Sequence, residues 1–322
     1  MRSSRAHRVV SLRGFVLACA VLLAYACAVH TTAGPKPAGQ QGFDSPESAV
    51  AALTTAMRGG DQAGLANILG DERLTPGAQG SGDSQAFLTA FDENHAIEHV
   101  NPATALLIIG KDRWTFPVPI VKSGKTWWFD GEAGLKETAN RVMDRNELLT
   151  IETMRAYVAA QMEYAGGQRG ETPGQFACRF ASEEGMKDGL YWHVPDGETP
   201  SPLGPQVAGA AYSECQAMGV TPVPFHGYFY KILTKQGPSA RGGAYDYMAG
   251  KALALGFACV AYPEKYGETG VMTFIVNQSG IVYQKDLGQG TQLAGEAMTA
   301  YDPDESWSAA ESAAPAQAGE AN

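Results

Sequence analysis

Cysteine is scarce in this sequence, with five residues in a chain of 322. The three that lie beyond the N-terminal region are too widely spaced for a cysteine metal site. Basic residues are outnumbered, with 24 Lys and Arg against 34 Asp and Glu, which gives a net charge of −10. This balance argues against nucleic acid as a partner, because phosphate binding needs clustered positive charge. It would also repel an anionic membrane surface.

The N-terminal apolar run, residues 15–29, is too short to span a bilayer, which takes about 20 residues. It follows a segment with four arginines and no acid, and it ends in the small-x-small pattern AYA. This is the form of a secretory signal peptide, so we expect residues 1–26 to be removed before Cys27. No twin-arginine pair is present, so export of the unfolded chain is expected. Cys27 at a new N-terminus could also be acylated, which would attach the protein to a membrane.

Export would place the later cysteines in an oxidising compartment. Cys178 and Cys215 both lie in turn-rich segments, so a disulfide between them is possible. Cys259 lies in an apolar strand and is expected to be a buried free thiol.

Polar, low-complexity segments flank the folded part of the chain. Residues 27–42 are a Pro/Gly-rich tether and 308–322 a small-residue acidic tail, and we expect neither to bury enough apolar surface to order itself. Between them we expect an N-terminal domain at 43–145 and a second domain at 146–307.

The N-terminal domain opens with clear helix signals. Ser45 is an N-cap residue and Pro46 suits the first helical position, although Ser48 stands where a complete capping box would have Glu. A GG pair ends this helix, Asp61 caps a second helix, and a third is centred on FLTAF.

Apolar strands follow these helices at TALLIIG, RWTFPVPIVK and KTWWFDG. The last two are expected to pair across the short turn SGK, because a glycine-containing turn between apolar strands is typical of a hairpin. Helices followed by a curved antiparallel sheet make this domain similar to the cystatin-like cone of the nuclear-transport-factor type.

A long helix opens the second domain, NELLTIETMRAYVAAQMEYA at 146–165. Apolar residues recur on one face at helical spacing: Leu148, Ile151, Met154, Val158, Met162 and Ala165. After an irregular segment at 166–226, strands resume at GYFYKILTKQG, ALALGFACVAYP, GVMTFIVNQ and GIVYQKDLG, with a tight turn at NQSG. One helix packed on an antiparallel meander predicts an α+β fold.

Several long motifs carry a family resemblance: the helix just quoted, KDGLYWHVPDGETPSPLGP, the strand region that follows HGYFYKIL, and YDPDESW. Over about residues 43–307 the chain resembles the bacterial family catalogued as domain of unknown function 2950. The resemblance implies export and supplies no activity.

The second half is also similar in plan to secreted pilin-like domains. The shared features are an Asn146-Glu147 helix start, an AQMEY helix end, a Gly227-Tyr228 strand, and the segments AYPEKYGETG and FIVNQSGIV. No hydrophobic polymerising helix precedes Asn146, so filament formation is not expected.

The segment DENHAIEHV contains the first candidate metal ligands. His95 and His99 are four residues apart, and with Asp92 they could share one helix face. The interpretation we favour is that they face solvent at a helix-to-strand junction.

Acidic residues offer a second candidate cation site. Asp302, Asp304 and Glu305, and also Asp188 or Asp196, could bind calcium through loop carboxylates. The full spacing of a calcium loop is absent, so neither a metal nor a cofactor is predicted.

Two serines lie in loops where a nucleophile could stand. Ser201 in ETPSPLGP and Ser239 in GPSARGG both lack the G-x-S-x-G frame of an activated serine. GPSARGG also lacks the lysine of a phosphate-binding loop, so its glycines are expected to serve loop geometry.

Two histidines could act as general bases. His193 follows a Tyr-Trp pair and His226 stands beside an aromatic strand, although a core histidine with both nitrogens satisfied is the commoner state. A periplasmic hydrolase that pairs either one with Asp188 or Asp246 is therefore the alternative function.

Aromatic residues are the strongest functional signal: Tyr191, Trp192, Phe225, Tyr228, Phe229, Tyr230, Tyr245 and Tyr247. Most are expected in the core, but GLYWHVP and GAYDYMAG are loop-like, so their rings cannot all be buried. Exposed aromatic residues on loops are typical of binding surfaces. We predict a binding site of Tyr191, Trp192, Tyr245 and Tyr247 in loops 186–205 and 236–250, with the 256–288 hairpins as its scaffold.

These observations favour an exported α+β protein of the periplasm or extracellular space that acts by binding or assembly. The expected partner is an envelope protein or a small-molecule ligand, and not nucleic acid. Membrane attachment is expected only if Cys27 is acylated.

Overall fold

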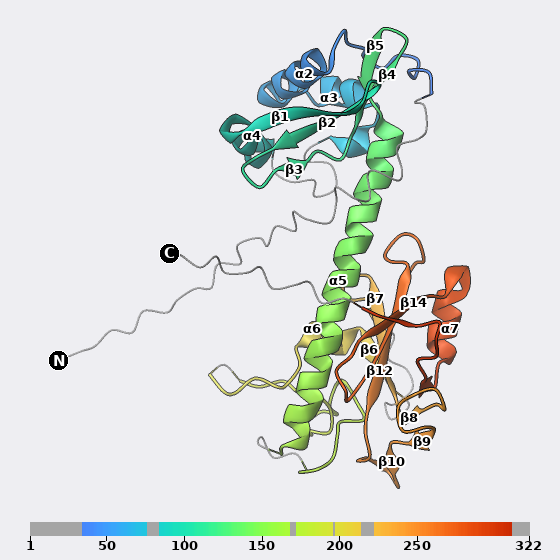
Figure 1. Ribbon diagram of the computed structural model, residues 1–322. Helices are drawn as coiled ribbons and strands as arrows, with labels where there is room; N and C mark the ends of the chain where they lie inside the picture. Colours follow the sequence, from blue (N-terminus) through green and yellow to red (C-terminus); the bar gives the residue numbers. More distant parts are fainter. Residues whose placement is uncertain (1–33, 76–83, 168–171, 196, 214–221, 311–322) are drawn as a thin grey trace, which may run out of the picture. The chain divides into compact units, whose positions relative to one another are not determined.

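A computed structural model describes residues 34–75, 84–167, 172–195, 197–213 and 222–310 (Figure 1). The expected signal peptide, Cys27 and most of the acidic tail lie outside these residues. The described chain combines helices with open, mainly antiparallel sheets, so the predicted α+β fold is confirmed. It forms two compact units, Met1–Ala139 and Asn140–Asn322, and the division falls inside helix α5 (Gly131–Ala165).

The first unit begins with the predicted helices, α2 (Pro46–Gly59), α3 (Gln62–Leu69) and α4 (Ser84–Glu93), with a 3-10 turn at Glu72–Leu74. The capping box of α2 is complete, contrary to expectation. Ser48 takes the role that Glu has in the usual capping box. Its hydroxyl accepts the Ser45 N–H at 3.1 Å, and the Ser45 hydroxyl accepts the Ser48 N–H at 3.2 Å.

The helices of the first unit cover one face of a five-stranded antiparallel sheet (Figure 1). Its strands are β1 (His95–Asn101), β2 (Thr104–Ile109), β3 (Trp114–Thr115), β4 (Ile120–Ser123) and β5 (Thr126–Phe129). The order is β1-β2-β4-β5, with β3 also paired to β2, and the predicted SGK turn joins β4 to β5. Leu53 of α2, Leu107 of β2 and Phe129 of β5 belong to one buried core.

Part of the expected tether is bonded to the first unit. The Gln40 side-chain amide donates to the carbonyl oxygens of Ile68 at 3.0 Å and Phe129 at 2.7 Å. Phe43 then pairs with Trp127, with both backbone hydrogen bonds at 2.8 Å. Gln40 therefore belongs to the fold, although composition alone assigns it to a linker. Its buried side chain supplies hydrogen bonds to two backbone carbonyl groups.

Helix α5 begins well before the predicted start at Asn146. The Asp130 carboxylate caps it by accepting the Ala133 N–H at 3.0 Å. Residues 136–145 are mostly exposed. They therefore lack the apolar periodicity from which a helix is predicted, although the helix continues through them.

In the second unit, the buried face of α5 differs from the predicted stripe. Met154 is buried as expected, but Met162 is 47% exposed. Tyr157, Gln161 and Tyr164 are buried instead. The prediction for Met162 was wrong because the pattern counted aliphatic residues only, whereas these polar side chains have hydrogen-bond partners in the interior.

The sheet of the second unit has six strands in the order β16-β14-β13-β12-β7-β6. They are β6 (Ala211–Tyr212), β7 (Tyr228–Leu233), β12 (Ala258–Pro263), β13 (Met272–Asn277), β14 (Tyr283–Asp286) and β16 (Ser308–Ala309). All pairs are antiparallel except β6 with β7. The predicted NQSG turn connects β13 to β14, with Gly280 at φ 75°.

Smaller elements surround this sheet. One three-stranded sheet contains β15 (Ala300–Tyr301), β8 (Lys235–Gln236) and β9 (Tyr245–Asp246), and a two-stranded sheet contains β10 (Met248–Ala249) and β11 (Ala252–Leu253). Short helices occur at α6 (Pro205–Gly209) and α7 (Thr291–Ala297), with a 3-10 turn at Gly288–Gly290.

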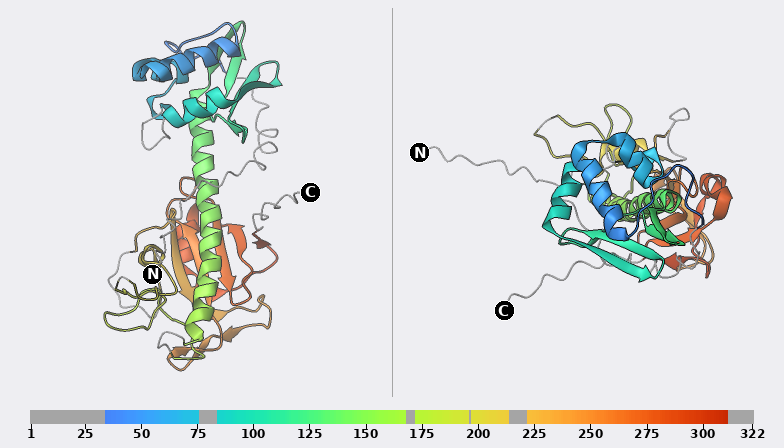
Figure 2. Two further views of the ribbon diagram at one scale, coloured as in Figure 1. Left: turned by 90° about the vertical axis from the view of Figure 1, so that its left-hand side faces the viewer. Right: turned by 90° about the horizontal axis from the view of Figure 1, so that it is seen from above.

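Helices α5 and α7 pack on opposite faces of the six-stranded sheet (Figures 1 and 2). On the α5 face, the Tyr230 hydroxyl donates to Thr150 at 3.4 Å. On the α7 face, the buried Lys231 ammonium donates to two carbonyls at the C-terminal end of α7, at 2.8 and 2.9 Å. A buried cation is tolerated here because backbone oxygens at a helix end replace its water shell.

The first residues of the pilin-like motif connect α5 to the sheet. The Asn146 side-chain amide donates to the Thr269 carbonyl at 2.9 Å. One Glu147 carboxylate oxygen accepts the N–H groups of Val271 at 2.8 Å and Met272 at 3.0 Å. These motif residues therefore hold the helix against the start of β13.

The cysteines of the second unit are in two states. Cys178 is disulfide-bonded. The expected partner, Cys215, lies outside the described residues. Cys259 is free and fully buried, as predicted, and burial raises the pKa of its thiol. Within the described ranges no helix has the length and apolar character that crossing a membrane requires.

Candidate functional site

Hydrogen bonds on both sides hold the loop that carries Tyr191 and Trp192. The Tyr191 N–H donates to the Phe180 carbonyl at 2.7 Å, and the Tyr191 carbonyl accepts the Ser182 N–H at 2.8 Å. From α5, the Tyr164 hydroxyl donates to the Lys187 carbonyl at 3.0 Å. The loop is irregular, but its backbone is fastened to the helix and to the preceding segment.

A groove of about 510 Å³ lies along this loop. Its lining residues are Lys187, Trp192, His193, Val194, Gly197, Glu198 and Thr199. Trp192 is 7% exposed, and the Lys187 ammonium lies 5.3 Å from its ring centroid, which is a cation–π distance. The groove thus combines an aromatic edge with charged groups of both signs and a hydroxyl, a mixture suited to recognising a polar ligand.

The four rings predicted to bind do not form one exposed cluster. Tyr247 is fully buried and donates its hydroxyl to Gln236 at 2.9 Å, whereas Tyr245 is 38% exposed. Tyr191 is half-buried and Trp192 is buried. Loop-like sequence is therefore a poor guide to exposure here, because Gln236 supplies an interior partner for the Tyr247 hydroxyl. Among the described residues, no aromatic ring pair joins the two loops.

The alternative hydrolase residues are not brought together. Asp188 accepts the Glu183 N–H at 2.9 Å and pairs with Arg179 at 3.2 Å, while Asp246 accepts the N–H of Met248 at 2.8 Å. Within the described chain, no hydrogen bond or ion pair links either carboxylate to His193 or to His226. His193 lies exposed in the groove.

His226 occupies a tight hairpin turn. Phe225 and Tyr228 exchange both backbone hydrogen bonds, at 3.0 and 3.1 Å, around His226 and Gly227. The central residues have φ of 52° and 72°, as a type I′ turn requires. Partial burial and then the charge of Arg145 lower the pKa of His226. Its backbone conformation gives it a structural role that sequence analysis did not find.

The turn predicts how His226 responds to substitution. His226→Asn should leave the free energy of unfolding within about 0.5 kcal/mol of wild type, because Asn accepts left-handed backbone angles. His226→Val should lose about 1–2 kcal/mol, since a β-branched residue is strained there. Urea unfolding measures both. Equal stability of the two variants would contradict the turn assignment.

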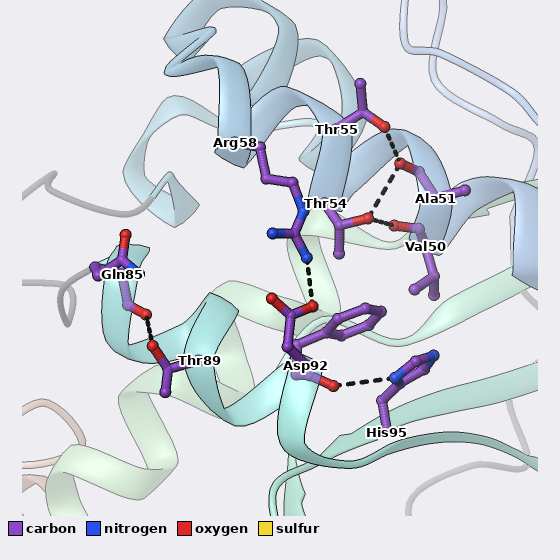
Figure 3. Close-up of polar contacts among 10 residues, drawn as sticks. Val50, Ala51, Thr54, Thr55, Arg58, Gln85, Thr89, Asp92 and His95 are labelled. Atoms are coloured by element: carbon purple, nitrogen blue, oxygen red, sulfur yellow. Dashed lines mark hydrogen bonds and ion pairs between the residues drawn. The ribbon is translucent and has the colours of Figure 1, made fainter.

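Two of the candidate metal ligands of the first unit, Asp92 and His95, make polar contacts with other residues (Figure 3). Helix α4 ends at Glu93 and strand β1 begins at His95, so His95 and His99 do not share a helix face. Both residues are exposed just beyond this helix-to-strand junction, as the favoured interpretation expected. Asp92 is ion-paired with Arg58, and His95 Nδ1 is 3.0 Å from the Phe91 carbonyl. The described residues contain no group of three or more His, Cys, Asp or Glu placed to hold a metal ion.

The candidate calcium ligands and loop serines form hydrogen bonds within the protein. Asp302 accepts the Ser239 N–H at 2.7 Å, and Asp304 accepts the Ser306 N–H at 2.8 Å. Bonds from Ser306 lower the pKa of Asp304. Ser201 donates its hydroxyl to the Leu203 carbonyl at 2.9 Å. Asp196 lies outside the described residues.

The fold and the groove define the class of this chain as an α+β protein of two compact units with a candidate site on the loops of the second. The chain belongs to the family described as "Protein of unknown function (DUF2950)", whose model matches residues 40–310. This match confirms the family resemblance drawn from the sequence motifs. Comparison with curated proteins and with solved structures gives no match. The likeness to pilin-like domains stays a prediction.

Proposed function

We propose that this chain is an exported cell-envelope protein that binds a partner through the groove beside Trp192, without catalysis. The N-terminal sequence supports export, because it has the charge and apolar pattern of a signal peptide. The groove supports binding, because one aromatic edge and several polar side chains line it.

The observation that carries this proposal is that hydrogen bonds hold the backbone of the Tyr191-Trp192 loop in place. Tyr191 is bonded on both sides, and Tyr164 holds the carbonyl of Lys187 from α5. Binding to a surface that is already ordered loses less conformational entropy than binding to a free loop. The groove contains one histidine, His193, and no carboxylate is hydrogen-bonded to it within the described chain, whereas the base of a nucleophile–base pair is typically oriented by such a third group.

Site-specific photocrosslinking tests this function. A photoreactive residue at His193 should capture a defined adduct in intact cells, identified by mass spectrometry. The same residue at Leu293, which is 74% exposed in the same unit, should not capture it. Adding Glu198→Lys to the His193 probe should reduce the adduct several-fold, because the reversal changes the charge of the groove. The same spectra should show the mature chain without residues 1–26.

Three outcomes would count against the proposal. Equal adducts from both positions would show non-specific capture. An intact N-terminus in the mature protein would contradict export. Hydrolysis of a captured molecule, lost in His193→Gln but retained in Glu198→Lys, would favour the periplasmic hydrolase instead.

A further inference from the structure

We propose that loop 235–256 of the second unit is an interaction surface for an acidic segment of a partner protein, centred on Arg241 and Tyr245. This surface involves none of the residues that line the Trp192 groove. The proposal is therefore independent of the proposed function.

The loop is fixed from inside by one buried amide. Gln236 is 3% exposed, and its Nε2 donates to the carbonyls of Arg241 at 3.0 Å and Gly243 at 2.6 Å. Its Oε1 accepts the Tyr247 hydroxyl at 2.9 Å. Gln236 therefore bonds three groups of the same loop from its buried side. These bonds fix the loop backbone while its outer surface stays exposed.

Two further features hold the tip of the loop. The Asp302 carboxylate accepts the Ser239 N–H at 2.7 Å. Gly242 and Gly243 have φ of 96° and 77°, which residues with a Cβ rarely adopt. The GPSARGG segment, which sequence analysis assigned to loop geometry, therefore presents Arg241 from a defined backbone.

The side chains displayed on this loop suit protein recognition. Arg241 is exposed, and no hydrogen bond or ion pair engages its guanidinium within the described chain. The backbone next to Arg241 lies close to the Tyr245 ring, because a Cβ built on Gly242 would be 4.0 Å from that ring. Gln278 donates to the Tyr245 hydroxyl at 3.3 Å and fixes that ring in a half-exposed position. Arginine and tyrosine are the residue types that dominate binding energy at interfaces.

An apolar side chain extends the same surface. Leu255 is 59% exposed, and the adjacent Gly256 lies against the buried Tyr247 ring. The Gln278 amide reaches both Gly256 and the Tyr245 hydroxyl, so Leu255 and Tyr245 belong to one region.

Charge identifies the kind of partner. Residues 235–256 contain the cations Lys235, Arg241 and Lys251 and one acid, Asp246, in a chain with a net charge of −10. All three cations are exposed. A carboxylate of the partner can accept two hydrogen bonds from the Arg241 guanidinium. An apolar residue next to that carboxylate in the partner can pack on Tyr245. Anionic lipid is disfavoured, since electrostatic membrane binding uses clusters of about four to eight cations.

Fluorescence anisotropy tests the proposal with two labelled synthetic peptides, one of Glu and Leu and one in which Lys replaces each Glu. The mature full chain should bind the acidic peptide and not the basic one, more weakly at high salt. Arg241→Glu and Tyr245→Ala should each weaken binding about tenfold or more. Arg241→Lys should give an intermediate loss, because it keeps the charge and removes the paired contact.

The matched control is Lys125→Glu, the same charge reversal on an exposed turn of the first unit. It should leave peptide binding unchanged, and thermal unfolding should show that all variants fold. Binding of both peptides alike, or no effect of Arg241→Glu, would overturn the proposal. Binding to phosphatidylglycerol vesicles in place of the acidic peptide would also overturn it and assign the surface to a membrane.

Discussion

Raising the pH above 10 is expected to unfold the second unit cooperatively. Its core contains the buried tyrosines Tyr157, Tyr228, Tyr230, Tyr247, Tyr262 and Tyr301. Burial is the main cause that raises the pKa of each, to about 12 for Tyr230 and Tyr247 from the ordinary value of 10.0. The folded state therefore resists ionisation that the unfolded state accepts.

The direction of the effect follows from proton binding. Below pH 10 the tyrosines are neutral in both states, so their contribution to stability is complete. Between pH 10 and 12 the unfolded chain loses these protons first, and stability falls as the pH rises. Tyr230 and Tyr247 alone account for about 5 kcal/mol of this loss, within the range of a whole domain's stability, about 5–15 kcal/mol.

A pH titration with two signals checks this expectation. Tyrosinate absorbance of the buried residues and loss of far-ultraviolet circular dichroism should occur together, because ionisation requires unfolding. Tyr230→Phe should move the alkaline midpoint upward, since it removes one of the ionising groups. Complete tyrosinate absorbance with unchanged dichroism would show that the rings ionise in the folded protein.

Gln161→Leu is expected to lower the free energy of unfolding by about 4 kcal/mol. Gln161 is fully buried in α5. Its side-chain amide donates to the Ala177 carbonyl and accepts the Ala177 N–H, both at 2.8 Å, and it also donates to the Tyr157 hydroxyl at 3.1 Å. Leucine has a similar volume but would leave both Ala177 groups buried and unpaired, at about 1–3 kcal/mol each.

Urea unfolding measures this loss, and Met162→Leu is the matched control. Met162 is the next residue of the same helix and is 47% exposed, so its replacement should change stability by no more than about 0.5 kcal/mol. Hydrogen exchange should also accelerate around Ala177 in the Gln161 variant. A loss below 1 kcal/mol would mean that the Ala177 peptide does not depend on Gln161.

Local rules predicted the elements with strong end signals. Ser45, Pro46 and the GG pair define α2, and the SGK and NQSG turns define two hairpins, because capping and turn geometry depend on a few adjacent residues. The first half of α5 could not be predicted in the same way. Its residues 136–145 are mostly exposed, and a solvated helix shows no apolar period.

The candidate site was predicted as a region but not as a set of residues. The sequence pointed to the Tyr191-Trp192 loop, yet the grouping of Lys187, Glu198 and Thr199 around Trp192 depends on how the loop folds back. Gln161 bonds the buried backbone of Ala177, and Gln236 bonds the backbone of loop 235–256. Gln161 interrupts the apolar run YVAAQM. An isolated glutamine in such a run is a signal for a buried backbone contact, which an aromatic pattern does not reveal.

The buried thiol of Cys259 gives the sheet a native kinetic reporter. Cys259 lies in β12, with β7 on one side and β13 on the other, and is inaccessible to solvent. Burial also keeps it in the unreactive thiol form, because only the thiolate attacks electrophiles. A thiol reagent can therefore modify Cys259 only during excursions in which the central strands separate. Under native conditions the modification rate at this residue reports how often the interior of the second unit opens.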